Sequence, residues 1–128
     1  MKKQKGKKPA FIVDVQLYYK DFQDKFGKKA NFSTVASLTG RTNTADIEIF
    51  EKCVSEKKHI ITQNYKHFRK IKKSKPHSKV GIVGICTDRI SQAIDQFGET
   101  LKIYPSHSSY EGKLLKITSS SVKEDLER

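Results

Sequence analysis

Three short apolar runs stand out along the chain: AFIVDV (10–15), HIIT (59–62) and VGIVGIC (80–86). They are rich in β-branched residues and nearly continuous, which is typical of strands buried on both faces of a sheet. The first run is interrupted by a single acid, Asp14. We therefore expect three buried strands.

The segments around these runs have the three- and four-residue spacing of amphipathic helices. We expect helices at 16–26 (ending at Gly27), 42–58, 65–73 (a short helix or turn) and 89–97 (ending at Gly98). Residues 31–40 indicate an ambiguous strand ending in a turn. LKIY (101–104) and GKLLKITS (112–119) alternate apolar and polar residues, so we expect two edge strands joined by a turn at 110–112.

Two of the expected helices have candidate caps. In the helix at 42–58, Asn43 or Thr44 is the expected N-cap, which places Asp46 in the first turn, where the helix dipole favours a negative charge. Thr87 or Asp88 is the expected cap of the helix at 89–97. The apolar face expected for the helix at 42–58 consists of Ile47, Phe50, Cys53 and Val54.

Strands that alternate with helices predict an α/β fold, with a central, mostly parallel sheet covered by helices on both faces. The edge strands add a C-terminal hairpin. We expect one domain at 10–119, preceded by a basic mobile arm at 1–9 and followed by a polar tail at 120–128.

The charge of the chain changes the picture. Its 128 residues contain 26 Lys and Arg against 14 Asp and Glu, a formal net charge of +12, and the pI is near 9.7. Such an excess attracts polyanions: nucleic acid is the first candidate and an anionic membrane surface the second. A solubilising surface is the alternative, because lysine-rich compositions also mark some thermophiles.

Cysteine usage and hydropathy bear on the compartment. Cys53 and Cys86 lie far apart without a CxxC or CxxH motif, so we expect core residues in a reducing compartment rather than a zinc site. No apolar run is long enough to span a bilayer, and no signal peptide is recognised at the start. We therefore expect a cytoplasmic protein with no membrane partner.

Four oxygen-bearing side chains lie where strands end or helices begin. Asp14 is near the end of the first strand, Asn64 follows HIIT, Asp46 begins the helix before HIIT, and Asp88 follows VGIVGIC. Sites in open parallel sheets form beyond the carboxyl ends of the strands. The four side chains are therefore candidate ligands of Mg²⁺ or Mn²⁺, a metal that can activate water for phosphodiester hydrolysis.

Each of these residues also has a structural explanation. Asp46 is equally suited to a first-turn acid, Asp88 to a helix cap, and Asn64 to a turn. Thr62 either orients a ligand or water, or simply favours the strand. Asp14 is the hardest to explain structurally, because a lone carboxylate in an apolar strand is costly unless it is paired or bound to metal.

A strongly basic segment follows Asn64. The residues expected to contact nucleic acid are Tyr65, Lys66, His67, Arg69, Lys70, Lys72 and Lys73. Cations would hold flanking phosphates, and the rings of Tyr65 and His67 would stack on unpaired bases. The alternative is a solvated lysine face, with Phe68 and Ile71 as core anchors.

The order FIVDV, TADIEIFEKCVSEKKHIITQNYKHF and VGIVGI resembles a PIN-like domain of the short prokaryotic form, from Phe11 to Cys86. The resemblance implies a metal-dependent ribonuclease, often a toxin paired with an antitoxin. It also implies that Asp14 and Asp46 are metal ligands and that Asn64 occupies the third ligand position.

The chain departs from this family pattern at several positions. Many relatives have Asp at the positions of Asn64 and His67. The Glu that larger PIN domains place between the first two acids has no clear counterpart, with Asp21 the nearest substitute. Two firm carboxylates would hold a divalent metal weakly.

These observations leave two functions open. The first is a PIN-like, metal-dependent endoribonuclease, with RNA as substrate. The alternative is a catalytically weakened module that binds RNA or a protein partner. An antitoxin protein and a second copy of the chain are the protein partners to test.

Overall fold

A computed structural model describes residues 7–41 and 43–126. The strands are β1 (Ala10–Val13), β2 (Asn31–Thr34), β3 (His59–Thr62), β4 (Ile82–Ile85), β5 (Leu114–Ile117) and β6 (Val122–Glu124). The helices are α1 (Tyr19–Phe26), α2 (Val35–Thr39), α3 (Asp46–Glu56), α4 (Tyr65–Ser74), α5 (Ile90–Ile103) and the 3-10 helix η1 (His107–Tyr110). The three strands expected from the apolar runs are present.

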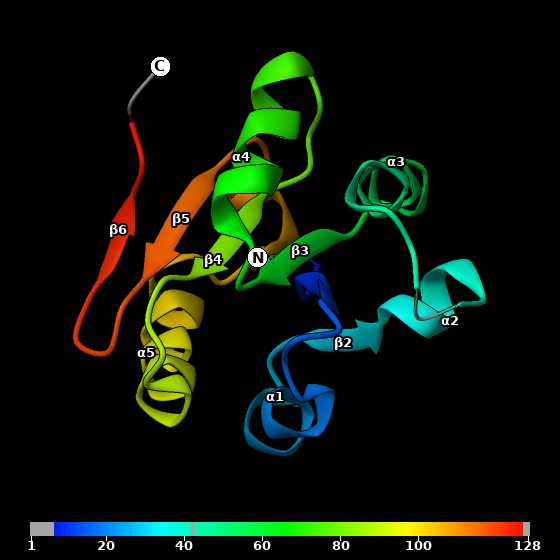
Figure 1. Ribbon diagram of the computed structural model, residues 1–128. Coiled ribbons are helices and arrows are strands. Elements are labelled where there is room, and N and C mark those ends of the chain that lie inside the picture. Colours follow the sequence, from blue (N-terminus) through cyan, green and yellow to red (C-terminus); the bar gives the residue numbers. More distant parts are fainter. Residues whose placement is uncertain (1–6, 42, 127–128) are drawn as a thin grey trace, which may run out of the picture.

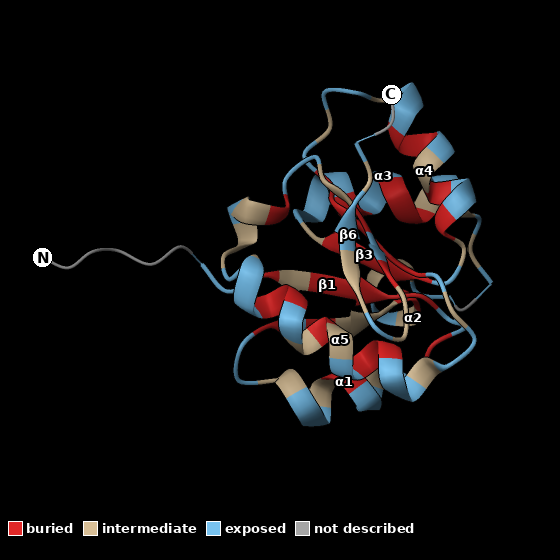
Figure 2. Ribbon diagram, turned by 90° about the vertical axis from the view of Figure 1, so that its left-hand side faces the viewer, coloured by how far each residue is buried: buried red, intermediate tan, exposed pale blue. Residues whose placement is uncertain are grey.

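The strands form one sheet in the order β2-β1-β3-β4-β5-β6. Every neighbouring pair is parallel except β5 and β6, which are antiparallel. Figure 2 shows α1 and α5 on one side of the sheet and α3 and α4 on the other. The expected α/β fold with a mostly parallel, doubly covered sheet is confirmed.

Two hydrophobic cores lie on opposite faces of the sheet because successive strand residues point to opposite sides. Phe11 and Val13 of β1 join the core beneath α1 and α5, whereas Ile12 between them joins the core beneath α2, α3 and α4. Phe97 of α5 and Phe50 of α3 are fully buried in these two cores. Strand β1 is therefore packed on both faces, which fixes the position of Asp14 just after its carboxyl end.

The edge strand expected at 101–104 is wrong. Helix α5 continues past Gly98 to Ile103, and Leu101 extends its buried stripe beyond Phe97 by one turn. A Cβ on Gly98 would approach the ring of Phe26 to 3.1 Å, so a small residue suits this helix position for packing. Gly98 therefore lies within the helix and does not end it.

The C-terminal hairpin consists of β5 and β6. Figure 1 shows β6 as the outermost strand of the sheet, although its residues were expected in a polar tail. At the other end of the chain, Pro9 is buried and its carbonyl accepts a hydrogen bond from the Asn31 N–H (2.9 Å). The Lys7 carbonyl also accepts from the His107 N–H (2.8 Å), and residues 1–6 of the expected mobile arm lie outside the described residues.

Helix α3 differs from its expected form in its cap and its buried face. Its N-cap is Ala45, without a side-chain cap hydrogen bond, because the Thr44 hydroxyl bonds to Thr39 and to the Arg41 carbonyl instead. Asp46 lies in the first turn as expected. The buried residues are Ile49, Phe50 and Cys53, whereas Ile47 and Val54 are exposed.

Two glycines of the VGIVGIC run lie against other parts of the chain. A Cβ on Gly81 would lie 2.2 Å from the Tyr110 carbonyl oxygen, and one on Gly84 would lie 2.4 Å from the ring of Tyr65. The backbone of another segment therefore approaches closely at Gly81, whereas a side chain fills the space at Gly84. In the described part of the chain, no helix combines the length and apolar character that a bilayer span requires.

Candidate active site at the carboxyl edge of the sheet

Asp14 lies immediately after β1, where its backbone N–H still bonds to the Ile61 carbonyl of β3 (2.9 Å). Its side chain is buried, with 5% of its surface exposed. One carboxylate oxygen accepts from the Val15 N–H (2.8 Å) and the other from the Thr62 hydroxyl (2.6 Å). These two bonds offset the cost of burying the charge.

Thr62 connects Asp14 to the next turn of the chain. Its hydroxyl oxygen donates to Asp14 and accepts from the Asn64 backbone N–H (2.9 Å). The Asn64 side-chain amide then donates to Asp46 Oδ2 (2.8 Å). Because the amide nitrogen faces Asp46, the amide oxygen of Asn64 is left as a neutral acceptor or metal ligand.

Asp46 at the start of α3 receives a second donor. His67 Nδ1 lies 2.6 Å from the same Asp46 oxygen that accepts from Asn64. The Asp46 side chain is 18% exposed and that of His67 is 53% exposed, so this end of the network faces solvent. We call Asp14, Thr62, Asn64, Asp46 and His67 the acid cluster.

The acid cluster brings together three of the four expected oxygen ligands. Asp88 is exposed in the turn after β4 and makes none of the hydrogen bonds of the cluster. Within residues 7–41 and 43–126, no group of three His, Cys, Asp or Glu side chains is arranged to hold a metal ion. The candidate donors are therefore two carboxylates and one amide oxygen, completed by water. Such a set suits Mg²⁺, which retains several waters.

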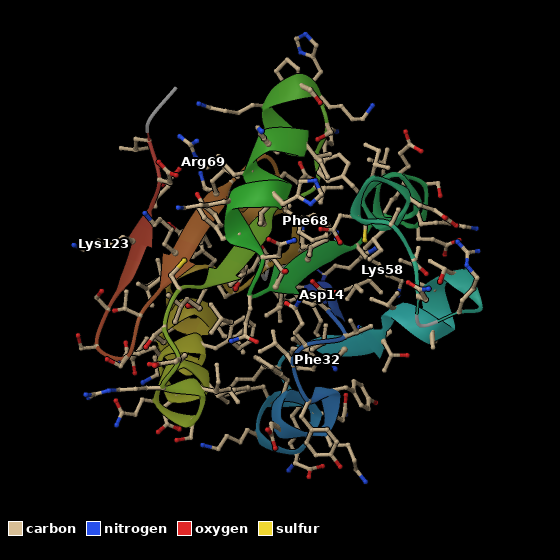
Figure 3. The ribbon with its side chains drawn as sticks, viewed as in Figure 1. Asp14, Phe32, Lys58, Phe68, Arg69 and Lys123 are labelled. Atoms are coloured by element: carbon tan, nitrogen blue, oxygen red, sulfur yellow. The ribbon has the colours of Figure 1, made fainter. Side chains whose placement is uncertain are left out.

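Helix α4 begins at the acid cluster and has two different faces. Tyr65, Phe68 and Ile71 are buried against the core beneath α3 and α4, and Figure 3 shows Phe68 on the side of α4 that faces α3. The exposed lysines of this helix follow helical spacing on one face. We call Lys66, Lys70 and Lys73 the lysine stripe.

Two residues expected to contact nucleic acid are turned inward. Lys72 is 6% exposed, and its amino group donates to the carbonyls of Pro76 (3.5 Å) and Ser78 (3.2 Å). Burial lowers the pKa of Lys72. Tyr65 is also 6% exposed, so its ring does not offer a face to stack on a base. Both side chains stabilise α4 instead, because they lie on its buried face.

Arg69 is tied to the C-terminal segment, a contact that sequence reasoning missed. Asp125, just after β6, accepts from Arg69 Nε (2.9 Å) and from the Tyr65 hydroxyl (2.6 Å). Burial raises the pKa of the Tyr65 hydroxyl, and the hydrogen bond to Asp125 raises it further. Figure 3 shows Arg69 on the side of α4 that faces β5 and β6.

A groove of about 510 Å³ lies beside this contact. It is lined by Asn64, Lys66, Arg69, Lys116 and the exposed Cys86, among others.

The expectation that Cys86 is a core residue is wrong, because the chain turns outward after β4. Cys53 is buried as expected, and burial raises its pKa to about 12.

Comparisons with known proteins add nothing to this geometry. No family model matches the chain, and neither a curated relative nor a solved structure matches it significantly.

Proposed function

We propose that the chain is a PIN-like, metal-dependent endoribonuclease. The observation that carries the proposal is the acid cluster, in which Asp14 and Asp46 are linked through Thr62 and Asn64 at the carboxyl edge of the sheet. Ligand sites of open parallel sheets form at this edge. The resemblance of the sequence to short PIN-like domains supports the same assignment.

Mg²⁺ or Mn²⁺ would be held by the carboxylates of Asp14 and Asp46 and by the amide oxygen of Asn64. When bound, the metal supplies a Lewis acid and a more acidic water for phosphodiester hydrolysis. Thr62 fixes the orientation of the Asp14 carboxylate through its 2.6 Å hydrogen bond. His67 is held beside Asp46 at the exposed end of the cluster, where it can bind a substrate phosphate.

RNA is the proposed substrate because the lysine stripe leads away from the acid cluster along α4. Lysine contacts to phosphates position a strand without reading its sequence. We therefore propose a nuclease with little base specificity. The proposal also includes a toxin role with an antitoxin partner, for which the only support is the resemblance of the sequence to short PIN-like domains.

A second candidate function is an RNA-binding module without catalysis. Asp46 Oδ2 already accepts from both Asn64 and His67, so one of the carboxylate oxygens is occupied. With two carboxylates in the cluster, metal affinity would be low. The lysine stripe would serve this function equally well.

The test is cleavage of a labelled RNA across a Mg²⁺ and Mn²⁺ titration for the wild type, Asp14→Asn and Asn64→Asp. Asp14→Asn should strongly reduce cleavage because it removes one of two carboxylates. Asn64→Asp should raise the rate at limiting metal, since an ionised oxygen binds Mg²⁺ more tightly than an amide oxygen. The exposed Asp88→Asn is the matched control and should cleave like the wild type.

The same Asn64→Asp variant gives a readout besides activity. Asn64 donates to Asp46, so an Asp at position 64 replaces a hydrogen bond with a repulsion between two carboxylates. We expect a lower melting temperature without metal, and a larger rise on adding Mg²⁺ than in the wild type. Undiminished cleavage in chelator would contradict the metal-dependent reaction. No cleavage by any variant, with RNA binding intact, would favour the binding module.

A further inference from the structure

A second hollow lies at the opposite edge of the sheet. It has a volume of about 480 Å³, within the range of small-molecule sites. Its walls come from the end of α3, the start of β3, residues 77–80 and η1. Because β1, β3 and β4 are parallel, their amino ends meet at this edge, which lies at the left of Figure 2. We call it the amino-edge hollow.

Two stacked imidazoles form one wall of the hollow. The rings of His59 and His107 lie 4.2 Å apart between centroids, at an interplanar angle of 29°. His59 Nδ1 accepts from the Gly81 N–H (2.8 Å), and His107 Nδ1 accepts from the Ala10 N–H (3.1 Å). A ring nitrogen that accepts a hydrogen bond carries no proton, so both imidazoles are neutral here. His59 is buried, so the partly exposed ring of His107 is the one that offers a flat, uncharged surface to the hollow.

Lysines surround this surface. Lys7, Lys57, Lys58 and Lys79 line the hollow, together with a single acid, Glu111. Across the described residues, none of these four lysines has a carboxylate within ion-pair distance. Like charges gathered at one concave site create a positive potential that an anion would relieve.

The backbone at Lys57 is an independent observation. Lys57 ends α3 in the left-handed conformation, with φ 60° and ψ 54°, and is the only non-glycine residue with positive φ in the described ranges. Gly or Asn usually occupies this position, and another residue there costs on the order of 1 kcal/mol. Lysine at this position places an amino group at the hollow at a cost in stability, which is the pattern of a functional site.

We propose that the amino-edge hollow binds a nucleotide. Its phosphate would lie between the side chains of Lys57 and Lys79, because the Lys58 amino group bonds to the Ser33 hydroxyl of β2 instead (3.5 Å). Its base would lie against the neutral imidazole of His107 and the apolar side chains of Val54 and Val80, which also line the hollow. A flat apolar wall beside a cluster of cations matches the two chemical halves of a nucleotide. This site is separate from the acid cluster and goes beyond the proposed ribonuclease.

The test is calorimetric titration of the full chain with ADP, with inorganic phosphate and with adenosine. ADP should bind more tightly than either of its parts. Lys57→Gly is the informative variant, because glycine suits the left-handed backbone and the fold should be at least as stable. Losing one charged contact to phosphate should weaken ADP binding about tenfold. Lys52→Ala on the exposed face of α3 removes the same charge and should bind ADP like the wild type.

Competition with RNA separates two sources of the nucleotide. Displacement of ADP by a 5′-phosphorylated oligoribonucleotide, but not by its 5′-hydroxyl form, would assign the hollow to an RNA end. No displacement by either would assign it to a free nucleotide. Three results would overturn the proposal: no ADP binding by the wild type up to millimolar concentration, phosphate binding as tightly as ADP, or equal ADP binding by Lys57→Gly and the wild type.

Discussion

The two edges of the parallel sheet hold their polar side chains in different ways. At the carboxyl edge, the charges of Asp14 and Asp46 are held mainly by side-chain donors from Thr62, Asn64 and His67, with the Val15 N–H as one backbone donor. At the amino edge, backbone N–H groups hold His59 and His107 in neutral form, and the charges lie on lysines around them. Side-chain networks can be altered one group at a time, whereas imidazoles held by the backbone belong to the fold.

Because of this difference, we expect substitutions at the amino edge to lower the stability of the fold the most. In Gly81→Ala, the new methyl group would lie 2.2 Å from the Tyr110 carbonyl oxygen, a backbone atom that cannot rotate away. We expect the free energy of unfolding to fall by about 3 kcal/mol, measured by urea denaturation. Gly98→Ala is the matched control and should change it by less than about 1 kcal/mol, because its methyl group meets only the edge of the Phe26 ring. Equal effects would contradict the distinction between the edges.

The next effect is a pH dependence that belongs to the amino edge. Burial lowers the pKa of His59 to about 4, from an ordinary value of 6.5. Between these two values the unfolded chain binds a proton that folded His59 excludes, so stability should fall as the pH drops from 6.5 towards 4. The loss is at most about 3 kcal/mol.

Urea unfolding at several pH values measures this loss. His59→Asn retains a side-chain acceptor for Gly81 but does not titrate, so its stability should depend less on pH in the same window. Identical pH dependence in both proteins would assign the effect to other groups.

The smallest expected effect concerns the carboxyl edge, where two lysines of α4 should have different roles. Lys72→Met removes two hydrogen bonds to carbonyls and should lower the free energy of unfolding by about 1 kcal/mol, with little effect on RNA affinity. Lys70→Met should do the opposite: unchanged stability, and a salt dependence of RNA binding that is weaker by about one unit of slope. Binding measured across a salt series decides the point. If both variants weakened the salt dependence of RNA binding equally, Lys72 would also be a residue that contacts RNA.

The carboxyl edge could be anticipated because its residues follow directly from the strand assignment. Asp14 and Asn64 lie just after strands whose apolar runs are unambiguous, and parallel strands end at one edge. The roles within α4 were less accessible. The spacing of Tyr65, Phe68 and Lys72 places them on one face of the helix. The sequence alone does not distinguish a buried lysine on that face from the exposed lysines beside it.

The amino edge could not be anticipated. His59 and His107 are 48 positions apart, and each is fixed by a backbone N–H that leaves no trace in the pattern of side chains. Asp125 is similar: its partner Arg69 lies 56 positions away, and the surrounding residues are polar enough to suggest a tail. Contacts of this range depend on the assembled sheet rather than on local periodicity.

The antiparallel strand β6 also has a consequence for how molecules meet one another. An open sheet edge with free N–H and C=O groups is a template on which another chain can add a strand and begin to aggregate. The edge beyond β5 is instead covered by three residues, of which Lys123 and Glu124 are exposed. A strand this short and charged gives an incoming chain few backbone groups to pair with. Strand β6 therefore makes this edge of the sheet a poor template for self-association.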